Sequence, residues 1–234
     1  MIDFMDNNAM GILYLVPTPI GNMQDITLRA LEVLKNVVLV ACEDTRRSGQ
    51  LLAHFGIKAK KISYFEHNEI RRIPKILEIL KEGKSVAVIS DGGSPGISDP
   101  AFRIVKAAID EGISVEALPG ATALIPALTA SGLPTDRFFF EGFLPVKKGK
   151  RRSRLLEISE YPHTIVIYES VHRIKKTIIE VAEIFAEREV CVIREISKMH
   201  EEKILNSAIE VAGIIEKSNP KGEYVIVISG AKHA

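Results

Sequence analysis

The chain has 234 residues, of which 46% are hydrophobic and 26% are charged, and its formal net charge is +1. This ordinary soluble composition fits one large domain or two small ones, and the low net charge gives no global field for nucleic acid, although a local basic patch would suffice. No apolar run reaches the ~20 residues that span a bilayer, and the only cysteines, Cys42 and Cys191, argue against a disulfide framework or a cysteine metal site, so we expect a cytoplasmic protein without membrane contact.

The first ten residues contain two aspartates and no lysine or arginine, which argues against a signal peptide and predicts a loose leader. Short β-rich segments then alternate with segments of helical spacing. We expect strands at residues 12–17, 37–42, 61–65, 86–90 and 113–118, and helices at residues 26–35, 48–55, 70–81 and 101–110. This βαβα alternation predicts a mainly parallel sheet that is covered on both faces.

The alternation pauses near residue 119, where a helix begins that ends near residue 131, and an aromatic strand follows at 137–143. It then resumes with strands at residues 163–168, 190–194, 203–205 and 223–229, and with helices at residues 171–185 and 208–217. We therefore predict an α/β protein of two domains with mainly parallel or mixed sheets. The expected limits are residues 11–118 and 119–234.

The loop at residues 90–100, between a buried strand and a helix, contains three glycines and two prolines. Open α/β sheets bind ligands where strands hand over to helices, and glycine lets the backbone approach a ligand closely. Asp91 and Asp99 can accept hydrogen bonds from hydroxyl or ammonium groups. Asp99 and Pro100 also fit the N-cap and first position of the next helix. We interpret the whole loop as a ligand-binding loop.

Other loops also follow strands. Residues 16–22 contain two prolines and Gly21 but no G-x-G-x-x-G pattern, which argues against a nicotinamide or flavin site. Residues 43–47 either bind a polar substrate through acidic and arginine side chains or begin a helix, and both readings stay open. The small residues at 119–123 either expose N–H groups to a ligand or allow close packing. Residues 168–173 and 194–198 could face the same cleft.

A basic run occupies residues 147–154, where six of eight residues are lysine or arginine. Such a run either grips the phosphates of RNA or forms the solvated start of a helix. The residues by themselves leave both readings open.

Several short motifs span nearly all of residues 12–229, in an order that a known protein family shares. They are LVPTPIGN at 15–22, EDTR at 43–46, the loop at 90–100, Pro119-Gly120, SGLPTDR at 131–137, EGFLP at 141–145, YES at 168–170, His172-Arg173 and KGE at 221–223. Through them the chain resembles the tetrapyrrole methylase superfamily, the class III S-adenosylmethionine-dependent methyltransferases. Within it, the chain is most similar to the branch that methylates a cytidine 2′-hydroxyl in small-subunit (16S) ribosomal RNA. Pro17 and Pro19 stand where the superfamily has glycines, and this substitution resembles the ribosomal RNA branch. Ser94 replaces the aspartate of the superfamily's G-D-P motif.

The resemblance implies two α/β domains with the cofactor in the cleft between them, a homodimer, and ribosomal RNA or the small ribosomal subunit as the partner. The branch often runs longer at its C-terminus, so we expect any RNA contact of that extension to be absent or supplied elsewhere. The resemblance also favours RNA contact by the basic run, made by Lys147, Lys148, Lys150, Arg151 and Arg152, together with Arg46 near the cleft. No metal is expected. The resemblance places the cofactor, S-adenosylmethionine, against Pro19, Gly21, Asp91, Gly93, Ser94, Pro95, Ile97, Ser98, Thr122, Ala123, Tyr168 and Ser197.

A neutral ribose hydroxyl is a poor nucleophile, so a general base or a nearby cation would help it react. We expect Glu43 or Glu169 to accept the proton, or Lys198 to lower the pKa of the hydroxyl, and the sequence does not choose among them. Two other functions stay open. One is methylation of a carbon atom in a corrin or porphyrin ring, and the other is non-catalytic RNA binding or assembly.

Overall fold

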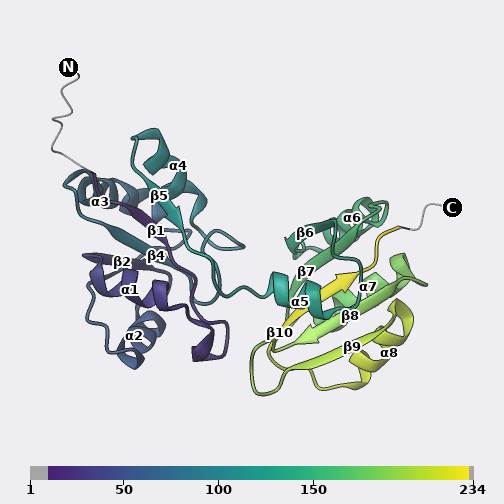
Figure 1. The fold of residues 1–234 in the computed structure, drawn as a ribbon. Coiled ribbons are helices and arrows are strands. Elements are labelled where there is room, and N and C mark those ends of the chain that lie inside the picture. The colour runs from purple at the N-terminus through teal and green to yellow at the C-terminus, as the bar shows by residue number, and fades with distance from the viewer. Residues whose placement is uncertain (1–9, 232–234) are drawn as a thin grey trace. The chain divides into compact units, whose positions relative to one another are not determined.

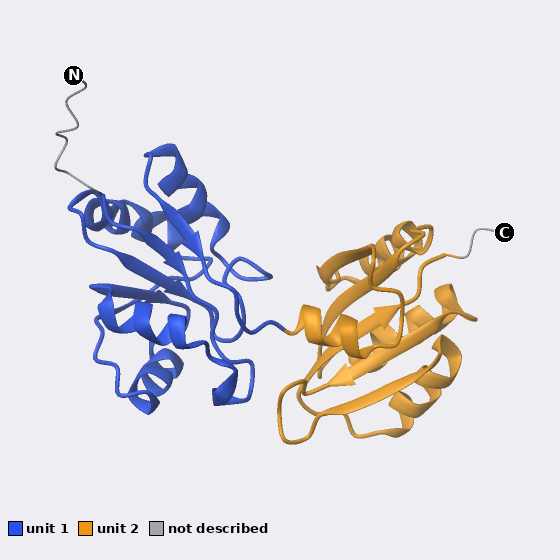
Figure 2. Ribbon diagram, viewed as in Figure 1, with its two compact units in different colours: residues 1–122 blue, residues 123–234 orange. Residues whose placement is uncertain are grey.

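The computed structural model describes residues 10–231, which fall into two compact units divided after residue 122 (Figures 1 and 2). Residues up to Thr122 form unit 1, and residues from Ala123 onward form unit 2. The predicted domain limit lies a few residues before this division. The leader that was expected at the start of the chain lies mainly in residues 1–9, outside the described residues.

Unit 1 is built on a sheet of five parallel strands in the order β3-β2-β4-β1-β5. The strands are β1 (Leu13–Leu15), β2 (Leu39–Cys42), β3 (Lys61–Ser63), β4 (Val86–Ile89) and β5 (Val115–Ala117). All four residues of β2 and of β4 are buried, as expected of central strands with a helical layer on each side.

Helices cover both faces of this sheet: α1 (Leu28–Asn36), α2 (Thr45–His54), α3 (Glu69–Lys81) and α4 (Phe102–Asp110), with a short 3-10 helix, η1 (Met23–Asp25), before α1. Successive side chains of a strand point to opposite faces. Val86 and Val88 of β4 therefore pack in the core with α3 and α4, whereas Ala87 and Ile89 pack in the core with α1 and α2.

The chain changes faces at the carboxyl ends of three adjacent strands. The loops after β1 and β2 lead to α1 and α2 on one face, and the loop after β4 leads to α4 on the other. Because β4 lies between β2 and β1, the loop after β4 leaves toward one face of the sheet while the loops on both sides of it leave toward the other face. Ligands of open α/β sheets bind at such a point, so this edge of unit 1 is the candidate site.

Unit 2 contains a mixed sheet in the order β6-β7-β10-β8-β9, in which β6 and β7 are parallel and the other neighbours are antiparallel. Its strands are β6 (Phe138–Phe143), β7 (Thr164–Ser170), β8 (Glu189–Arg194), β9 (Glu202–Ser207) and β10 (Glu223–Ile228). Since β7 and β8 both run opposite to β10, their carboxyl ends meet at one edge of the sheet.

Three helices of unit 2, α6 (Lys148–Ser159), α7 (Ile174–Phe185) and α8 (Ala208–Lys217), share one hydrophobic core with the sheet. Alternate strand residues such as Ile165, Val192 and Ile226 point into this core. The short helix α5 (Leu124–Ala130) packs against β10. No helix among the described residues is long and apolar enough to cross a membrane.

The predicted elements are confirmed in type, and their limits differ at particular places. Helix α2 begins three residues earlier than residue 48, because the side chain of Asp44 accepts a hydrogen bond from the Arg46 N–H at 2.8 Å and caps the helix. Helix α6 was not predicted as a separate element, since its basic residues obscured the apolar face formed by Leu155 and Ile158. The prediction that Asp99 caps α4 is wrong, because the cap position is Ala101.

Candidate functional site

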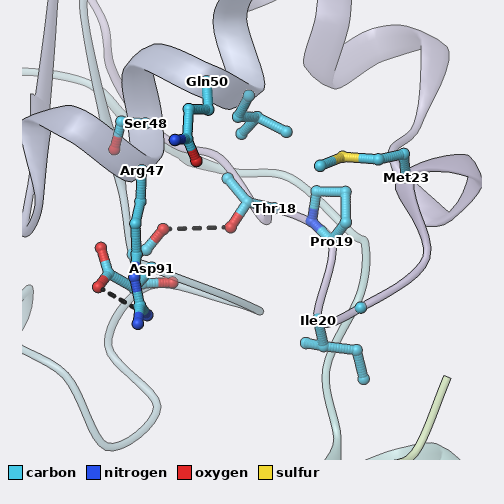
Figure 3. A pocket seen from close by; sticks show the side chains of 11 residues that line it. Thr18, Pro19, Ile20, Met23, Arg47, Ser48, Gln50 and Asp91 are labelled. Carbon is cyan, nitrogen blue, oxygen red and sulfur yellow. Dashed lines mark hydrogen bonds and ion pairs between the residues drawn. The ribbon is translucent and has the colours of Figure 1, made fainter. Parts of the chain in front are cut away.

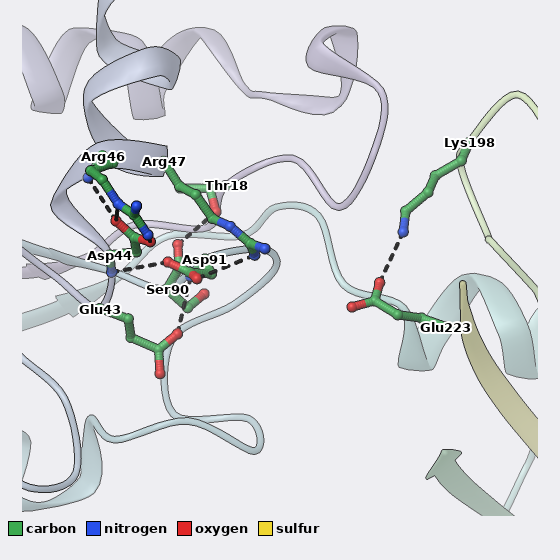
Figure 4. Close-up of polar contacts among 9 residues, drawn as sticks. All are labelled: Thr18, Glu43, Asp44, Arg46, Arg47, Ser90, Asp91, Lys198 and Glu223. Atoms are coloured by element: carbon green, nitrogen blue, oxygen red, sulfur yellow. Dashed lines mark hydrogen bonds and ion pairs between the residues drawn. The ribbon is translucent and has the colours of Figure 1, made fainter. Parts of the chain in front are cut away.

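The loops after β1 and β4 are joined by backbone hydrogen bonds at the edge of unit 1. The Thr18 N–H donates to the Gly93 carbonyl at 3.0 Å, and the Gly93 N–H donates to the Thr18 carbonyl at 2.8 Å. The buried Thr18 hydroxyl also donates to the Ser90 carbonyl at 3.1 Å (Figure 4). These bonds hold the two loops as one rigid surface.

The loop after β5 is held against the same surface. The Ser94 hydroxyl donates to the Ala121 carbonyl at 3.1 Å. A Cβ atom on Gly120 would lie 2.6 Å from the Cβ of Pro17, so only glycine allows this approach. Parts of the segments at residues 16–22, 90–100 and 119–123, which the sequence singled out separately, therefore meet in one place.

The loop at residues 90–100 adopts backbone conformations that suit a ligand cradle. Gly93 and Gly96 have φ of 92° and 90°, which glycine adopts readily. Ser98 has φ of 66°, which is uncommon for a residue with a Cβ atom. Such strain is typical of functional loops that the surrounding structure holds in place. Two predicted cofactor residues, Gly93 and Ser98, thus have positive φ, and Ser98 is the one non-glycine residue that does so in the described part of unit 1.

Acidic groups gather at the ends of β2 and β4 (Figure 4). The Asp91 N–H donates to Glu43 Oε2 at 3.2 Å, and Asp91 Oδ1 accepts from the Asp44 N–H at 3.1 Å. Arg47 Nη1 lies 3.3 Å from Asp91 Oδ2. Desolvation by burial raises the pKa of Glu43 above its ordinary value, and the hydrogen bond from Asp91 opposes this shift. Glu43 is therefore a better proton acceptor than an exposed glutamate.

Asp99 accepts a hydrogen bond from the Gly96 N–H at 2.5 Å. Burial raises its pKa from 3.8 to about 6, although this hydrogen bond opposes the shift. The folded protein therefore binds more protons at Asp99 than the unfolded chain does at pH values between these two pKa values. The resulting contribution to stability is full below the unfolded pKa and is lost as the pH rises through about 6.

We expect Asp99→Asn to remove this pH dependence. The free energy of unfolding of the variant, minus that of the wild type, should rise from acidic pH to neutral pH and then level off, because only the wild type has a partly buried carboxyl group at position 99 to ionise. Urea unfolding at several pH values measures this difference. Asp136→Asn, at an exposed position, should show no such trend. A difference that fell with rising pH would contradict the raised pKa.

In unit 2, the predicted catalytic residue Glu169 is buried, with 1% of its surface exposed. One carboxylate oxygen accepts from the Ser170 N–H at 2.8 Å, and the other accepts from Arg173 Nη2 at 3.0 Å and from the Thr177 hydroxyl at 2.6 Å. These partners join the end of β7 to the start of α7. The geometry therefore favours a structural role for Glu169 over proton transfer.

Lys198 follows β8 and is ion-paired with Glu195 at 2.8 Å and with Glu223 at 2.9 Å, the second of which Figure 4 shows. Partial burial lowers the pKa of Lys198, but the hydrogen bonds to the two carboxylates outweigh this effect and leave the pKa above its ordinary value. Lys198 therefore stays a cation. Glu195 and Ser197 beside it have φ of 53° and 63°, so this loop is also constrained.

The predicted cofactor residues divide between the units. Most belong to unit 1, whereas Ala123, Tyr168 and Ser197 belong to unit 2. Tyr168, near the end of β7, and Ser197, after β8, lie toward the same edge of the sheet. The Tyr168 ring contacts the rings of Phe140 and Phe143 edge-on, with 4.9 Å and 5.8 Å between the ring centroids. That the two sets form one cleft stays a prediction.

The structure corrects the predicted RNA contacts at Arg151. This side chain is 4% exposed and forms two hydrogen bonds with Glu180, at 2.8 Å and 2.7 Å. It faces the core between α6 and α7 and cannot offer its guanidinium to RNA. Arg152 is exposed and paired with Glu183. Lys147, Lys148 and Lys150 are exposed, so the candidate basic patch consists of these three lysines and Arg152.

Arg46 and Arg47 differ in their placement. Hydrogen bonds from Arg46 lower the pKa of Asp44 to about 2, and the Arg46 side chain is 88% exposed. Arg47, which the sequence offered only as one of the two arginines in the loop at residues 43–47, lines a pocket with Thr18 and Ser90. The correct start of α2 at Thr45 is the signal that could have found Arg47. In a helix that begins there, residue 47 shares a face with Leu51, four residues later, and both line the pocket.

Between residues 10 and 231, no group of three or more His, Cys, Asp or Glu side chains is placed to hold a metal ion.

Comparison with known proteins adds to this geometry. Residues 12–212 match the sequence profile of the family described as Tetrapyrrole (Corrin/Porphyrin) Methylases. A Streptococcus pyogenes protein named Ribosomal RNA small subunit methyltransferase I is 45% identical over 229 residues, which cover 98% of this chain and 80% of that protein.

Two solved structures share the fold. A cobalt precorrin-4 methyltransferase superposes with a TM-score of 0.69 at 19% identity, covering 93% of this chain and 94% of its own. A uroporphyrin-III C-methyl transferase from Thermus thermophilus, complexed with S-adenyl homocysteine, gives a TM-score of 0.64 at 23% identity, covering 94% and 97%. At these identities the likeness concerns the fold alone, and it confirms the predicted two-domain α/β class.

Proposed function

Since the chain belongs to the tetrapyrrole methylase family, in its ribosomal RNA branch, we propose that it is an S-adenosylmethionine-dependent methyltransferase of small-subunit ribosomal RNA. The observation that carries this proposal is the 45% identity to a small-subunit rRNA methyltransferase along 98% of the chain. A match of that length includes every loop of the candidate site. The finer proposal is that the acceptor is the ribose 2′-hydroxyl of a cytidine and that the protein acts as a homodimer.

The residues of unit 1 fit the cofactor. A Cβ atom on Gly92 or Gly93 would come within 3.4 Å of Pro19 or Ile20, so these glycines open a narrow cradle between the loops. Asp99 offers a carboxylate to the positive charge or the hydroxyl groups of such a ligand. S-adenosylmethionine would supply a methyl group on a sulfonium with a good leaving group. The protein's part is to align the acceptor oxygen with it, and orientation alone can contribute several kcal/mol.

A labelled methyl-transfer assay tests the proposed function. The wild-type protein is incubated with methyl-labelled S-adenosylmethionine and either small ribosomal subunits or naked 16S rRNA, and the modified nucleotide is mapped. We expect label in a cytidine ribose. Label only in a corrin or porphyrin substrate would support the small-molecule alternative. Calorimetry that showed no binding of the cofactor or of its demethylated product would support a non-catalytic RNA-binding protein.

Among the three candidate catalytic side chains, we expect Glu43 to matter most for the transfer step. Glu43→Gln keeps an acceptor for the Asp91 N–H but cannot take a proton, so the single-turnover rate should fall on the order of 100-fold. The cofactor dissociation constant should change little, and the rise of the wild-type rate with pH should be lost. An unchanged rate and pH profile would exclude Glu43 as the proton acceptor.

Variants of the other two side chains provide contrasts. Glu169→Gln should lower the free energy of unfolding, because it removes the buried charge that pairs with Arg173. Lys198→Met should lower the rate only if the cation assists the hydroxyl. A rate loss for Lys198→Met that exceeded the loss for Glu43→Gln would transfer the role to Lys198.

The exposed lysines at the start of α6 should contribute to RNA affinity through counterion release. The logarithm of the RNA association constant falls linearly with the logarithm of the salt concentration. Replacement of Lys147, Lys148 and Lys150 by glutamine should make this slope shallower by about 2, at ~0.7 per contact with single-stranded RNA. Filter binding at several salt concentrations measures the slope. The matched control replaces the exposed Lys58, Lys60 and Lys75 of unit 1 by glutamine and should leave the slope unchanged. Equal slopes in both triple variants would exclude this patch.

A further inference from the structure

A pocket of about 300 Å³ opens in unit 1 between the loop after β1, the first turns of α2 and the start of the loop after β4 (Figure 3). Its lining includes Thr18, Pro19, Ile20, Met23, Arg47 and Gln50. Ser90 and Asp91 from the loop after β4 complete one wall. The predicted cofactor residues account for only part of this pocket, because Met23, Arg47 and Gln50 in its lining are not among them.

The helical period of α2 selects the side chains that face this pocket. Residues 47, 50 and 51 are separated by three and four positions, so they lie on one face of the helix, and all three line the pocket. Arg46 is turned away and is paired with Asp44. Arg47 keeps 70% of its side chain exposed although it is paired with Asp91 at 3.3 Å. Its guanidinium therefore remains accessible to an incoming anion.

The lining offers three kinds of contact. Arg47 can bind a phosphate through its planar guanidinium. The Gln50 amide carries both donors and an acceptor, which matches the polar edge of a nucleobase. Met23, which is 41% exposed, and the ring of Pro19 present apolar surface to a flat ring. A phosphate, a polar edge and a flat apolar face occur together in a nucleotide.

We propose that this pocket holds the RNA nucleotide that is methylated, turned out of its strand. The inference rests on the proposed function and names the substrate position of that same site. Enzymes that modify a nucleotide commonly extrude it into a fitted pocket. Pro19, Gly21 and Asp91 line the pocket and are also predicted cofactor residues, so a nucleotide bound here lies beside the cofactor loop. Arg47 and Gln50 position the nucleotide, and Glu43 contacts Asp91, as Arg47 does, so it lies close to the pocket wall that Asp91 forms.

Methyl NMR can detect this binding without any methyl transfer. The chain has five methionines, and of the three that the structure describes, Met10, Met23 and Met199, Met23 lines the pocket. The protein is labelled with [methyl-13C]methionine and saturated with S-adenosylhomocysteine, and cytidine 5′-monophosphate is then titrated. The Met23 signal, assigned with Met23→Leu, should shift and saturate. Met199 of unit 2, which is 94% exposed, should not shift.

Variants locate the contacts. Arg47→Gln and Gln50→Leu should each weaken cytidine 5′-monophosphate binding at least about fivefold, while the affinity for S-adenosylhomocysteine stays within about twofold. Gln24→Leu is the matched control, because Gln24 is exposed and does not line the pocket, and it should bind the nucleotide as the wild type does. Circular dichroism of each variant establishes that it is folded.

Three results would overturn the inference: no shift of Met23 at saturating nucleotide, an equal shift of Met199, or competition between the nucleotide and S-adenosylhomocysteine. Competition would assign the pocket to the cofactor. Failure of the proposed function is a separate result, since it would appear as no methyl transfer to ribosomal RNA by the wild-type protein. Nucleotide binding at Met23 is measured whether or not transfer occurs.

Discussion

Replacement of Arg151 by methionine is expected to lower the free energy of unfolding by about 3–5 kcal/mol, because it leaves the carboxylate of Glu180 buried without its partner. Both side chains are almost fully buried, at 5% and 6% exposure, and they form two hydrogen bonds. Urea unfolding followed by circular dichroism measures the change. The double variant Arg151→Met with Glu180→Leu should recover most of the loss, since neither charge then remains in the core.

Arg152→Met is the matched control for this experiment. It removes the neighbouring arginine from the same helix, but its pair with Glu183 is about half exposed, so the cost should lie within about 1 kcal/mol. If Arg151→Met were as mild as Arg152→Met, the buried position of Arg151 would be wrong. In that case Arg151 would return to the set of candidate RNA contacts.

Replacement of Gly93 by alanine is expected to weaken cofactor binding at least about tenfold. Gly93 has φ of 92°, and an alanine held there carries strain of order 1–3 kcal/mol. Its Cβ would also press on Ile20 at 3.4 Å. The strain can be relieved only by a shift of the loop, which would disturb both hydrogen bonds to Thr18. Calorimetry with S-adenosylhomocysteine measures the affinity.

The control for Gly93 is Gly213→Ala. Gly213 lies inside α8, and a Cβ atom there would meet nothing within 4 Å. Alanine should therefore stabilise the helix by roughly 0.5–1 kcal/mol and leave cofactor affinity unchanged. Wild-type affinity in Gly93→Ala would show that the cofactor does not rely on the joined loops after β1 and β4.

Strand and helix types were predictable because their side-chain periods differ and are local. The buried run at β4 and the spacing of α4 both appear directly in the sequence. The ends of elements were less predictable. Asp44 and Asp99 are both acidic residues shortly before a helix, yet only Asp44 caps one, whereas Asp99 turns back to the Gly96 N–H.

The candidate site shows the same limit more strongly. Arg151 and Arg152 are identical neighbours in a basic run, but the partner that buries Arg151 is Glu180, on another helix. Glu169 lies near the end of β7 and Glu43 directly follows β2, yet only the carboxylate of Glu169 is enclosed by Arg173 and Thr177. No local sequence pattern predicts which charged side chain will be buried by a helix that follows later in the chain.

The sequence by itself determined that this is an α/β protein, that glycine- and proline-containing loops follow β1, β4 and β5, and to which family it belongs. Strand periodicity, the placement of glycine and proline, and the order of the motifs are properties of the chain alone. Only the tertiary structure decided that Thr18 and Gly93 join two of these loops, that Arg47 and not Arg46 faces the pocket, and that Arg151 is withdrawn from solvent. The physical reason is that the phase of a helix and the burial of a charge depend on partners that are distant in the sequence.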